Sequence, residues 1–321
     1  MSHHGGTKAI AAAMGANVAI AAAKFGAWLL TGAASLLAEA IHSAADSANQ
    51  ILMLIGGKAS RRPATAQHPF GFGRDRYISA FLVAIILFSM GGLFALYEAW
   101  HKFQEVAEGH PNELLESAWW WVPIAVLGFG IVAESFSLRT ALREIKAVKG
   151  SDSLVQFVRS SRAPELPVIL LEDIAALTGL VFAMAGVSLT LLTHNGYWDV
   201  IASGLIGVLL VAVAIIVAIE IKSLLVGESA RPEAEQRISQ ALTSDPALER
   251  LIYLKTIHIG PETILVAAKV AVAPDLDSAT VAAAIDAAEA RVRAAEPQVG
   301  PMFLEPDVWR DEDKAELVSE K

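Results

Sequence analysis

Six long apolar runs constrain the fold of this 321-residue chain more than any other feature of its sequence. They lie near 9–31, 34–57, 77–101, 118–141, 166–192 and 197–225. Each reaches the roughly 20 residues that an α-helix needs to cross the hydrocarbon core of a bilayer. Charged residues make up only 18% of the chain, against about 25% in a typical soluble domain. We therefore expect an integral α-helical membrane protein in which residues 1–226 form a six-helix transmembrane domain.

Glycines recur inside these runs, as is usual where transmembrane helices pack closely. Gly128 and Gly130 lie in the fourth run, and Gly204 and Gly207 lie in the sixth. We expect neighbouring helices to approach closely at these positions.

Lysine and arginine are unevenly distributed between the loops. The loops after the second and fourth runs are basic, with Lys58, Arg61, Arg62, Arg74, Arg76, Lys146, Lys149, Arg159 and Arg162, whereas the loop after the third run has Lys102 alone. Basic loops stay on the cytoplasmic side. Both termini are therefore predicted to be cytoplasmic, with Trp119–Trp121 at the opposite interface, and a bacterial inner membrane is the expected location.

The composition changes after Gly227. The pattern predicts a helix from Arg231 to about Gln240, strands at 251–258 and 263–272, a helix at 278–295 capped by Asp277 or Ser278, and a strand at 301–304. This α-β-β-α-β order indicates a small two-layer α+β domain over residues 227–309. Residues 310–321 are predicted to be a charged tail.

A polar face interrupts the second apolar run. His42, Asp46 and Asn49 are spaced four and three residues apart, so they share one face of a helix, and Glu39 lies one turn before His42. Imidazole and carboxylate together bind divalent transition metals. An isolated buried histidine often serves helix packing, but a histidine with acids inside a membrane indicates a functional site. We interpret this face as part of a metal path.

The fifth run holds two adjacent acids, Glu172 and Asp173. Neighbouring residues point about 100° apart on a helix, so one of the two is expected to bind metal while the other meets a neighbouring helix or a cytoplasmic vestibule. The alternative is that both lie at the water interface.

Lys24 and Glu39 lie almost symmetrically about the turn between the first two runs. In an antiparallel helix pair they would reach equal depth, which predicts a buried structural ion pair. Asn17 either lines the path or hydrogen-bonds between helices.

Three other polar residues are harder to assign. Glu134 is an intramembrane acid without an evident partner, and Asp199 is expected to cap the sixth run, although binding of an entering ion is the alternative. His68, in the loop before the third run, is either a second metal ligand or a residue that organises the start of that helix.

Together these features resemble the cation diffusion facilitator family. The resemblance rests on six spans, His42-Ser-Ala-Ala-Asp46 on the second, an acid on the fifth, His68-Pro-Phe-Gly-Phe-Gly-Arg before the third, and a small C-terminal α+β domain. It implies a homodimer that exports zinc or a related divalent ion from the cytoplasm in exchange for protons. The Glu172-Asp173 pair resembles the branch that includes zinc transporter 9.

The resemblance also implies the metal ligands. His42 and Asp46 match one pair of ligands and Asp173 matches the later member of the second pair, whereas the earlier position falls on Ile169, which cannot bind metal. The fourth ligand is then Glu172, Asn49, Asn17 or water. Other metal sites of the family are reduced: in the C-terminal domain, typical histidine positions fall on Ile252, Lys269 and Phe303, leaving Glu305. That domain is therefore expected to dimerise without sensing metal.

The expected function is proton-coupled export of a divalent metal by alternating access. Zinc is the predicted substrate because an imidazole ligand disfavours magnesium and calcium, with iron, manganese or cobalt as alternatives for an oxygen-rich site. No prosthetic group is expected, and the absence of cysteine excludes thiolate ligands. A membrane-anchored binding or regulatory protein is the alternative from another class. No enzyme motif and no basic aromatic patch for nucleic acid is found.

Overall fold

The computed structural model describes residues 3–110 and 113–310, with side chains described from Asn17 onward. Residues 311–321 of the predicted charged tail lie outside this range. The chain divides into two compact units, one of residues 1–56 and 78–222, the other of residues 57–77 and 223–321. The second unit thus combines the loop before the third span with the C-terminal domain.

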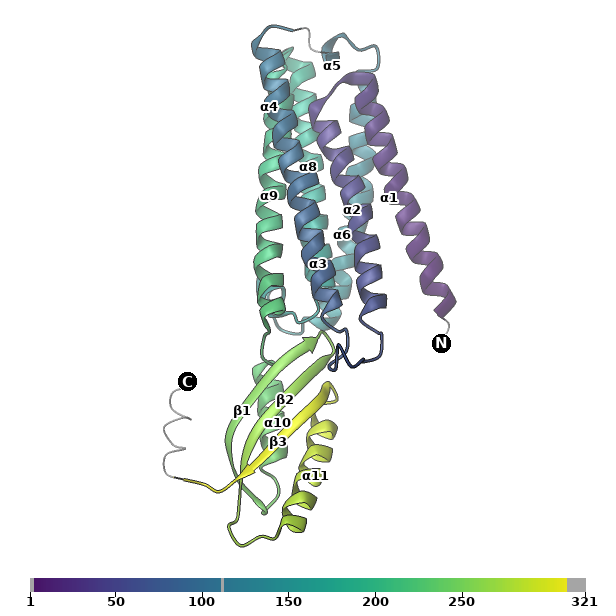
Figure 1. Cartoon of the computed structure of the whole chain (residues 1–321). Helices are drawn as coiled ribbons and strands as arrows, with labels where there is room; N and C mark the ends of the chain where they lie inside the picture. The colour runs from purple at the N-terminus through teal and green to yellow at the C-terminus, as the bar shows by residue number, and fades with distance from the viewer. Residues whose placement is uncertain (1–2, 111–112, 311–321) are drawn as a thin grey trace. The chain divides into compact units, whose positions relative to one another are not determined.

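The first unit consists of long helices that run side by side (Figure 1). Their bounds, with two short helices of the connecting loops, are α1 His3–Thr31, α2 Ala34–Ala59, α3 Asp75–Ile86, η1 Leu87–Leu93, α4 Phe94–Ala107, α5 Glu113–Glu116, α6 Trp121–Val148, α7 Leu154–Ser160, α8 Glu165–Thr193 and α9 Tyr197–Val226. Helix α6 packs along α8 and α1 packs against α6.

Four helical stretches in the described residues are long and apolar enough to cross a membrane: Asp75–Ala107, Trp121–Val148, Glu165–Thr193 and Tyr197–Val226. The described side chains of α1 form a shorter apolar stretch, Asn17–Thr31. Helix α2 is 26 residues long, but its polar face makes it less apolar than the other four. These helices occupy the six runs predicted from the sequence.

The third span differs from the single regular helix that its sequence predicts. A π-helical segment, η1, joins α3 to α4, and Gly91 and Gly92 in it lie against Leu210 and Val211 of α9. The wider turn of a π-helix is a local insertion that hydrophobic periodicity does not reveal.

Two of the four glycines singled out in the sequence are points of close approach. A Cβ on Gly207 would lie 2.9 Å from the backbone nitrogen of Leu96, and one on Gly130 would lie 3.1 Å from Leu180. Gly128 and Gly204 have only ordinary van der Waals neighbours, at 3.8 Å. Close packing of α9 on α4 therefore depends on Gly207 rather than on Gly204.

This difference yields a prediction for two alanine variants of one helix. Gly207→Ala should destabilise the protein by about 1–3 kcal/mol, because the new methyl group meets the backbone of α4 and the helices must separate. Gly204→Ala should be neutral or stabilising by up to about 1 kcal/mol, through higher helix propensity alone. Thermal unfolding of both variants in detergent measures the difference, and equal stabilities would contradict the assigned contact.

The second unit contains a three-stranded sheet covered by two helices (Figure 1). Its elements are α10 Pro232–Leu242, β1 Leu248–Gly260, β2 Thr263–Val272, α11 Ser278–Ala295 and β3 Val299–Asp307. The strand order is β1-β2-β3, with β1 antiparallel and β3 parallel to β2. Alternate residues of β2, from Ile264 to Val270, are buried in a core shared with both helices. The predicted α-β-β-α-β order is confirmed, including the Asp277 cap, whose Oδ1 accepts a hydrogen bond from Thr280 N at 2.7 Å.

The loop that precedes the third span folds with this second unit. Gly73 lies directly against the backbone of Ile259 and Gly260 at the β1–β2 turn. Inside the loop, the Arg62 guanidinium lies over the Phe72 ring at 3.9 Å and donates to Asp75 at 2.8 Å. The loop therefore has a defined structure of its own.

Candidate metal centre

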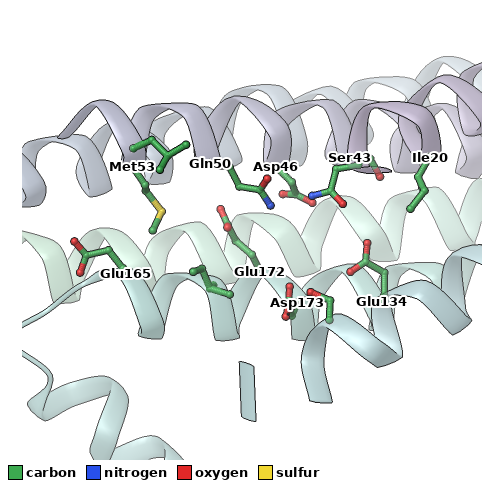
Figure 2. Close-up of a pocket in the computed structure, with 13 residues that line it drawn as sticks. Ile20, Ser43, Asp46, Gln50, Met53, Glu134, Glu165, Glu172 and Asp173 are labelled. Atoms are coloured by element: carbon green, nitrogen blue, oxygen red, sulfur yellow. Dashed lines mark hydrogen bonds between the residues drawn. The ribbon is translucent and has the colours of Figure 1, made fainter. Parts of the chain in front are cut away.

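A cavity of about 390 Å³ lies among helices α1, α2, α6 and α8 of the first unit (Figure 2). It is lined by Asn17, Ile20, Ser43, Asp46, Gln50, Met53, Leu54, Glu134, Ser137, Glu165, Ile169, Glu172 and Asp173. Five of these residues are acidic, and none is lysine or arginine. A low-dielectric cavity with this lining favours a bound cation or protonated acids, because unpaired carboxylates are costly to bury.

Four of the acids come from three different helices. Asp46 belongs to α2, Glu134 to α6, and Glu172 and Asp173 to α8, and Figure 2 shows them around the same cavity. Oxygen ligands from separate helices can be brought closer or moved apart by small shifts between those helices. This arrangement suits a transient ion site better than a rigid structural one.

The α2 side of the cavity holds unpaired polar atoms. His42 and Asp46 face each other one helical turn apart, with Nδ1 to Oδ1 at 3.5 Å. His42 is fully buried, and in the described residues neither of its ring nitrogens has a hydrogen-bond partner; Asp46 Oδ1 also has none. Buried polar atoms are normally bonded, so these three atoms are available for a ligand. His42 does not line the cavity itself, so Asp46 is the more accessible of the two.

On the α8 side, each acid is held by a different helix. Glu172 Oε1 accepts a hydrogen bond from Asn49 Nδ2 of α2 at 2.6 Å, and Asp173 Oδ2 accepts one from Ser137 Oγ of α6 at 3.1 Å. Both acids line the cavity, and each accepts a hydrogen bond from a different neighbouring helix. Asn49 connects the second and fifth spans through Glu172.

The predicted ligands are not assembled in this conformation. Within the described part of the chain, no three histidine, aspartate or glutamate side chains come close enough together to hold a metal ion. Asp46 and Glu172 lie on opposing helices across the cavity (Figure 2). The set of His42, Asp46, Glu172 and Asp173 remains a prediction for a state in which α2 and α8 move together.

Next to the cavity, Lys24 and Glu39 form an ion pair that is completely buried. Lys24 Nζ donates to Glu39 Oε2 at 2.9 Å and to Ser43 Oγ at 2.7 Å. The carboxylate fits because Gly179 of α8 has no side chain; a Cβ there would lie 2.4 Å from Glu39 Oε1. This cluster joins α1, α2 and α8 beside the cavity.

The secondary candidates have different positions. Asn17 lines the cavity, and so does Ile169, which occupies the position where the family resemblance implies a ligand. His68 belongs to the second unit, where it is exposed and lies 4.6 Å from the Phe72 ring. His68 is thus a loop residue of the second unit and does not line the metal cavity of the first unit.

Asp199 caps a different helix from the one expected. Its carboxylate accepts hydrogen bonds from Ala34 N at 2.6 Å and Ser35 N at 3.3 Å, and also from the Ser35 hydroxyl. It therefore caps the N-terminus of α2 instead of its own helix α9. The backbone donors at the start of α2 lack partners within the helix, and an acid from α9 supplies one.

The sequence analysis did not identify several cavity residues whose position depends on how the helices pack together. Ser43, Gln50, Ser137 and Glu165 line the cavity without any distinctive motif. Glu134 gave a signal, as an acid within an apolar run, but its position on the same side of the cavity as Asp173 depends on helix packing (Figure 2). Intramembrane polarity alone could have flagged it as a site residue.

In the C-terminal domain, Lys269 lies where the resemblance implies a metal ligand. Its ammonium is 3.0 Å from Asp307 and 3.3 Å from Glu305. The hydrogen bond from Lys269 holds the pKa of the Asp307 carboxyl below its usual range, and the pKa of Lys269 is raised by the same contact. A lysine thus supplies the positive charge beside these two acids, and the expectation that this domain does not sense metal stays a prediction.

Comparison with known proteins identifies a matching family and several similar proteins. Residues 10–226 match the family described as the cation efflux transmembrane domain. The chain is similar to the mitochondrial proton-coupled zinc antiporter SLC30A9 of Xenopus laevis, with 33% identity over 246 residues, covering 76% of this chain and 43% of that protein. For the Homo sapiens protein of the same name, identity is 34% over 240 residues, covering 74% and 41%. The chain spans less than half the length of these two relatives.

More distant similarities extend to plants and to solved structures. Metal tolerance protein C4 of Arabidopsis thaliana is 27% identical over 256 residues, covering 79% of this chain and 54% of that protein. A nickel form of the MamM CTD aligns with 16% identity and a TM-score of 0.24, covering 25% of this chain and 100% of that one.

Proposed function

Because the chain belongs to the cation efflux family, whose transmembrane domain it matches over residues 10–226, we propose that it exports a divalent metal cation, zinc, in exchange for protons. The observation that carries this proposal is the acidic cavity between membrane helices. Its lining includes Asp46, Glu134, Glu172 and Asp173 but no basic residue. A cavity of this kind attracts cations and would release them when its acids take up protons.

We infer that His42, Asp46, Asp173 and Glu172 bind the ion during transport. An approach of α2 toward α8 would bring the two pairs together, and the Glu172–Asn49 hydrogen bond would then be exchanged for a bond to metal. His42 would contribute the nitrogen ligand that selects zinc over magnesium and calcium. Alternating access requires that this approach occur with the cavity open first to one side of the membrane and then to the other.

Protons compete with the metal for the same side chains. Metal binding requires a neutral imidazole and ionised carboxylates, so affinity falls as the pH falls on the side where the site is open. His42 and the carboxylates of Asp46, Asp173 and Glu172 are therefore the proton carriers of this proposal. A proton gradient directed inward then drives metal outward.

The orientation and assembly are further parts of the proposal. We propose that both termini lie in the cytoplasm, because basic loops are expected on that side, and that the membrane is a bacterial inner membrane. The relatives compared above include mitochondrial proteins. The protein would act as a homodimer whose C-terminal domain contributes to the contact. Crosslinking in membranes tests the dimer separately from transport.

The direct test is flux in proteoliposomes that contain the purified protein and a zinc indicator together with a pH indicator. We expect zinc entry to be accompanied by proton movement in the opposite direction, and an imposed proton gradient to accelerate it. Protein-free liposomes supply the control. Zinc flux without proton movement would exclude the antiport mechanism, and no flux with any divalent metal would favour a binding or regulatory protein anchored in the membrane.

The proposed role of His42 predicts a change in pH dependence. In the parent protein, zinc uptake should decline as the pH on the zinc-containing side falls, because protons compete with zinc for its ligands. His42→Ala should lower uptake strongly, because the nitrogen ligand is lost, and should change the pH profile, because one of the groups that exchange metal for protons is gone. Uptake by the variant at the parent rate, with an unchanged profile, would refute the assignment.

The chemistry of the cavity also supports manganese or iron as an alternative transported ion. The polar groups that line the cavity carry carboxylate, amide and hydroxyl oxygens, which suit manganese or iron as well as zinc. The same proteoliposomes exposed to zinc, manganese, ferrous iron and cobalt separate these substrates. Flux with manganese or iron but not with zinc would keep the transport mechanism and change the ion.

A further inference from the structure

Helix α6 carries a basic groove on a face that the metal cavity does not use. Arg139, Arg143 and Lys146 follow one another at spacings of four and three residues and lie within about 60° of each other around the helix. All three are exposed. Together with Ser135, Leu138, Leu142 and with Leu177 of α8, they line a groove of about 360 Å³.

The charges in this groove are not neutralised by the protein. In the part of the chain that the structure describes, Arg139, Arg143 and Lys146 form no ion pair or hydrogen bond through their side chains. The neighbouring acid, Glu144, points about 140° away from Arg139 around α6. The face of α6 that lines the metal cavity is also far from these charges. Ser137, which donates a hydrogen bond to Asp173 on that face, lies about 160° around the helix from Arg139.

The groove lies at the depth of a headgroup region. Helix α6 begins at Trp121, and three consecutive tryptophans mark that end as one membrane interface. A hydrocarbon core of about 30 Å corresponds to about 20 helical residues, which places the other interface near Ala141. The basic residues therefore straddle this second interface, with leucines beside them on the hydrocarbon side.

We propose that this groove is a binding site for an anionic phospholipid. The phosphate would be held by Arg139, Arg143 and Lys146, and an acyl chain would lie along Leu138, Leu142 and Leu177. Charge complementarity selects an anionic headgroup, and basic pockets between transmembrane helices are suited to such groups. The leucine lining selects a lipid over a free phosphate, because a soluble ion has no use for an apolar wall.

The test compares lipid retention by the purified 321-residue protein in a mild detergent, measured by native mass spectrometry. Phosphatidylglycerol and phosphatidylcholine are the two probes. Arg139→Gln/Arg143→Gln/Lys146→Gln should weaken phosphatidylglycerol binding by at least about tenfold and leave phosphatidylcholine retention unchanged. Arg139→Lys/Arg143→Lys, which keeps the charge, should retain most of the affinity.

A matched control removes the same charge elsewhere. Lys58, Arg61 and Lys222 are also exposed basic residues, and changing all three to glutamine should leave phosphatidylglycerol binding within twofold of the parent. Equal losses in the two triple variants would mean general attraction of a basic surface to anionic lipid and would overturn the site. So would unchanged binding in the groove variant, or inorganic phosphate that binds the parent as tightly as the lipid does.

Discussion

Replacing Asp46 with asparagine is expected to lower metal flux in proteoliposomes by more than about 100-fold, because loss of a direct ligand should exceed the roughly 10- to 100-fold effect of removing an outer-shell partner. Asparagine has nearly the same shape but no charge. It would leave His42 as the one predicted ligand on α2, with a neutral amide in place of the carboxylate. Zinc uptake and internal pH, followed together, measure the loss of both fluxes.

Two controls separate a ligand effect from damage to the fold. Met53 lines the same cavity but cannot act as an oxygen or nitrogen ligand, so Met53→Leu should transport at a rate close to the parent's. Asp46→Asn should elute as a monodisperse protein with unchanged helical content, since among the described residues Asp46 Oδ1 has no hydrogen-bond partner. Parent-level flux in Asp46→Asn would remove Asp46 from the proposed site.

Local signals in the sequence were sufficient for the elements of the fold. The Asp277 cap and the strand at Thr263–Val272 coincide with their predicted positions, because caps and alternating burial are properties of neighbouring residues. The π-helical segment and the Asp199 cap could not be predicted in this way. Asp199 lies 165 positions from Ala34, and only the packing of α9 on α2 brings them together.

In the candidate site, too, local spacing was predictable from the sequence but contacts between helices were not. His42 and Asp46 were recognisable because a spacing of four residues fixes their relation on one helix. The hydrogen bonds from Asn49 to Glu172 and from Ser137 to Asp173 join residues 123 and 36 positions apart. Which partner each acid takes depends on the rotation of α6 and α8 about their axes, and no local pattern encodes that rotation.

The largest expected effect on stability comes from Lys24→Met. Methionine fills a similar volume but leaves Glu39 buried without a cation, and Ser43 loses its donor. Removing one partner of a buried pair typically costs about 3–5 kcal/mol, so the variant should unfold at clearly lower temperature in detergent. The measurement is thermal unfolding followed by circular dichroism.

The double variant Lys24→Met/Glu39→Gln decides whether the loss comes from the unpaired charge. Replacing a whole buried pair by neutral groups is often close to neutral, so the double variant should recover most of the stability that Lys24→Met loses. If it remains as unstable as the single variant, the packing of the lysine stem between α1 and α2 matters more than its charge. If Lys24→Met itself is as stable as the parent, then Glu39 does not need a cation at this depth, and the ion pair is not what joins the first two spans beside the cavity.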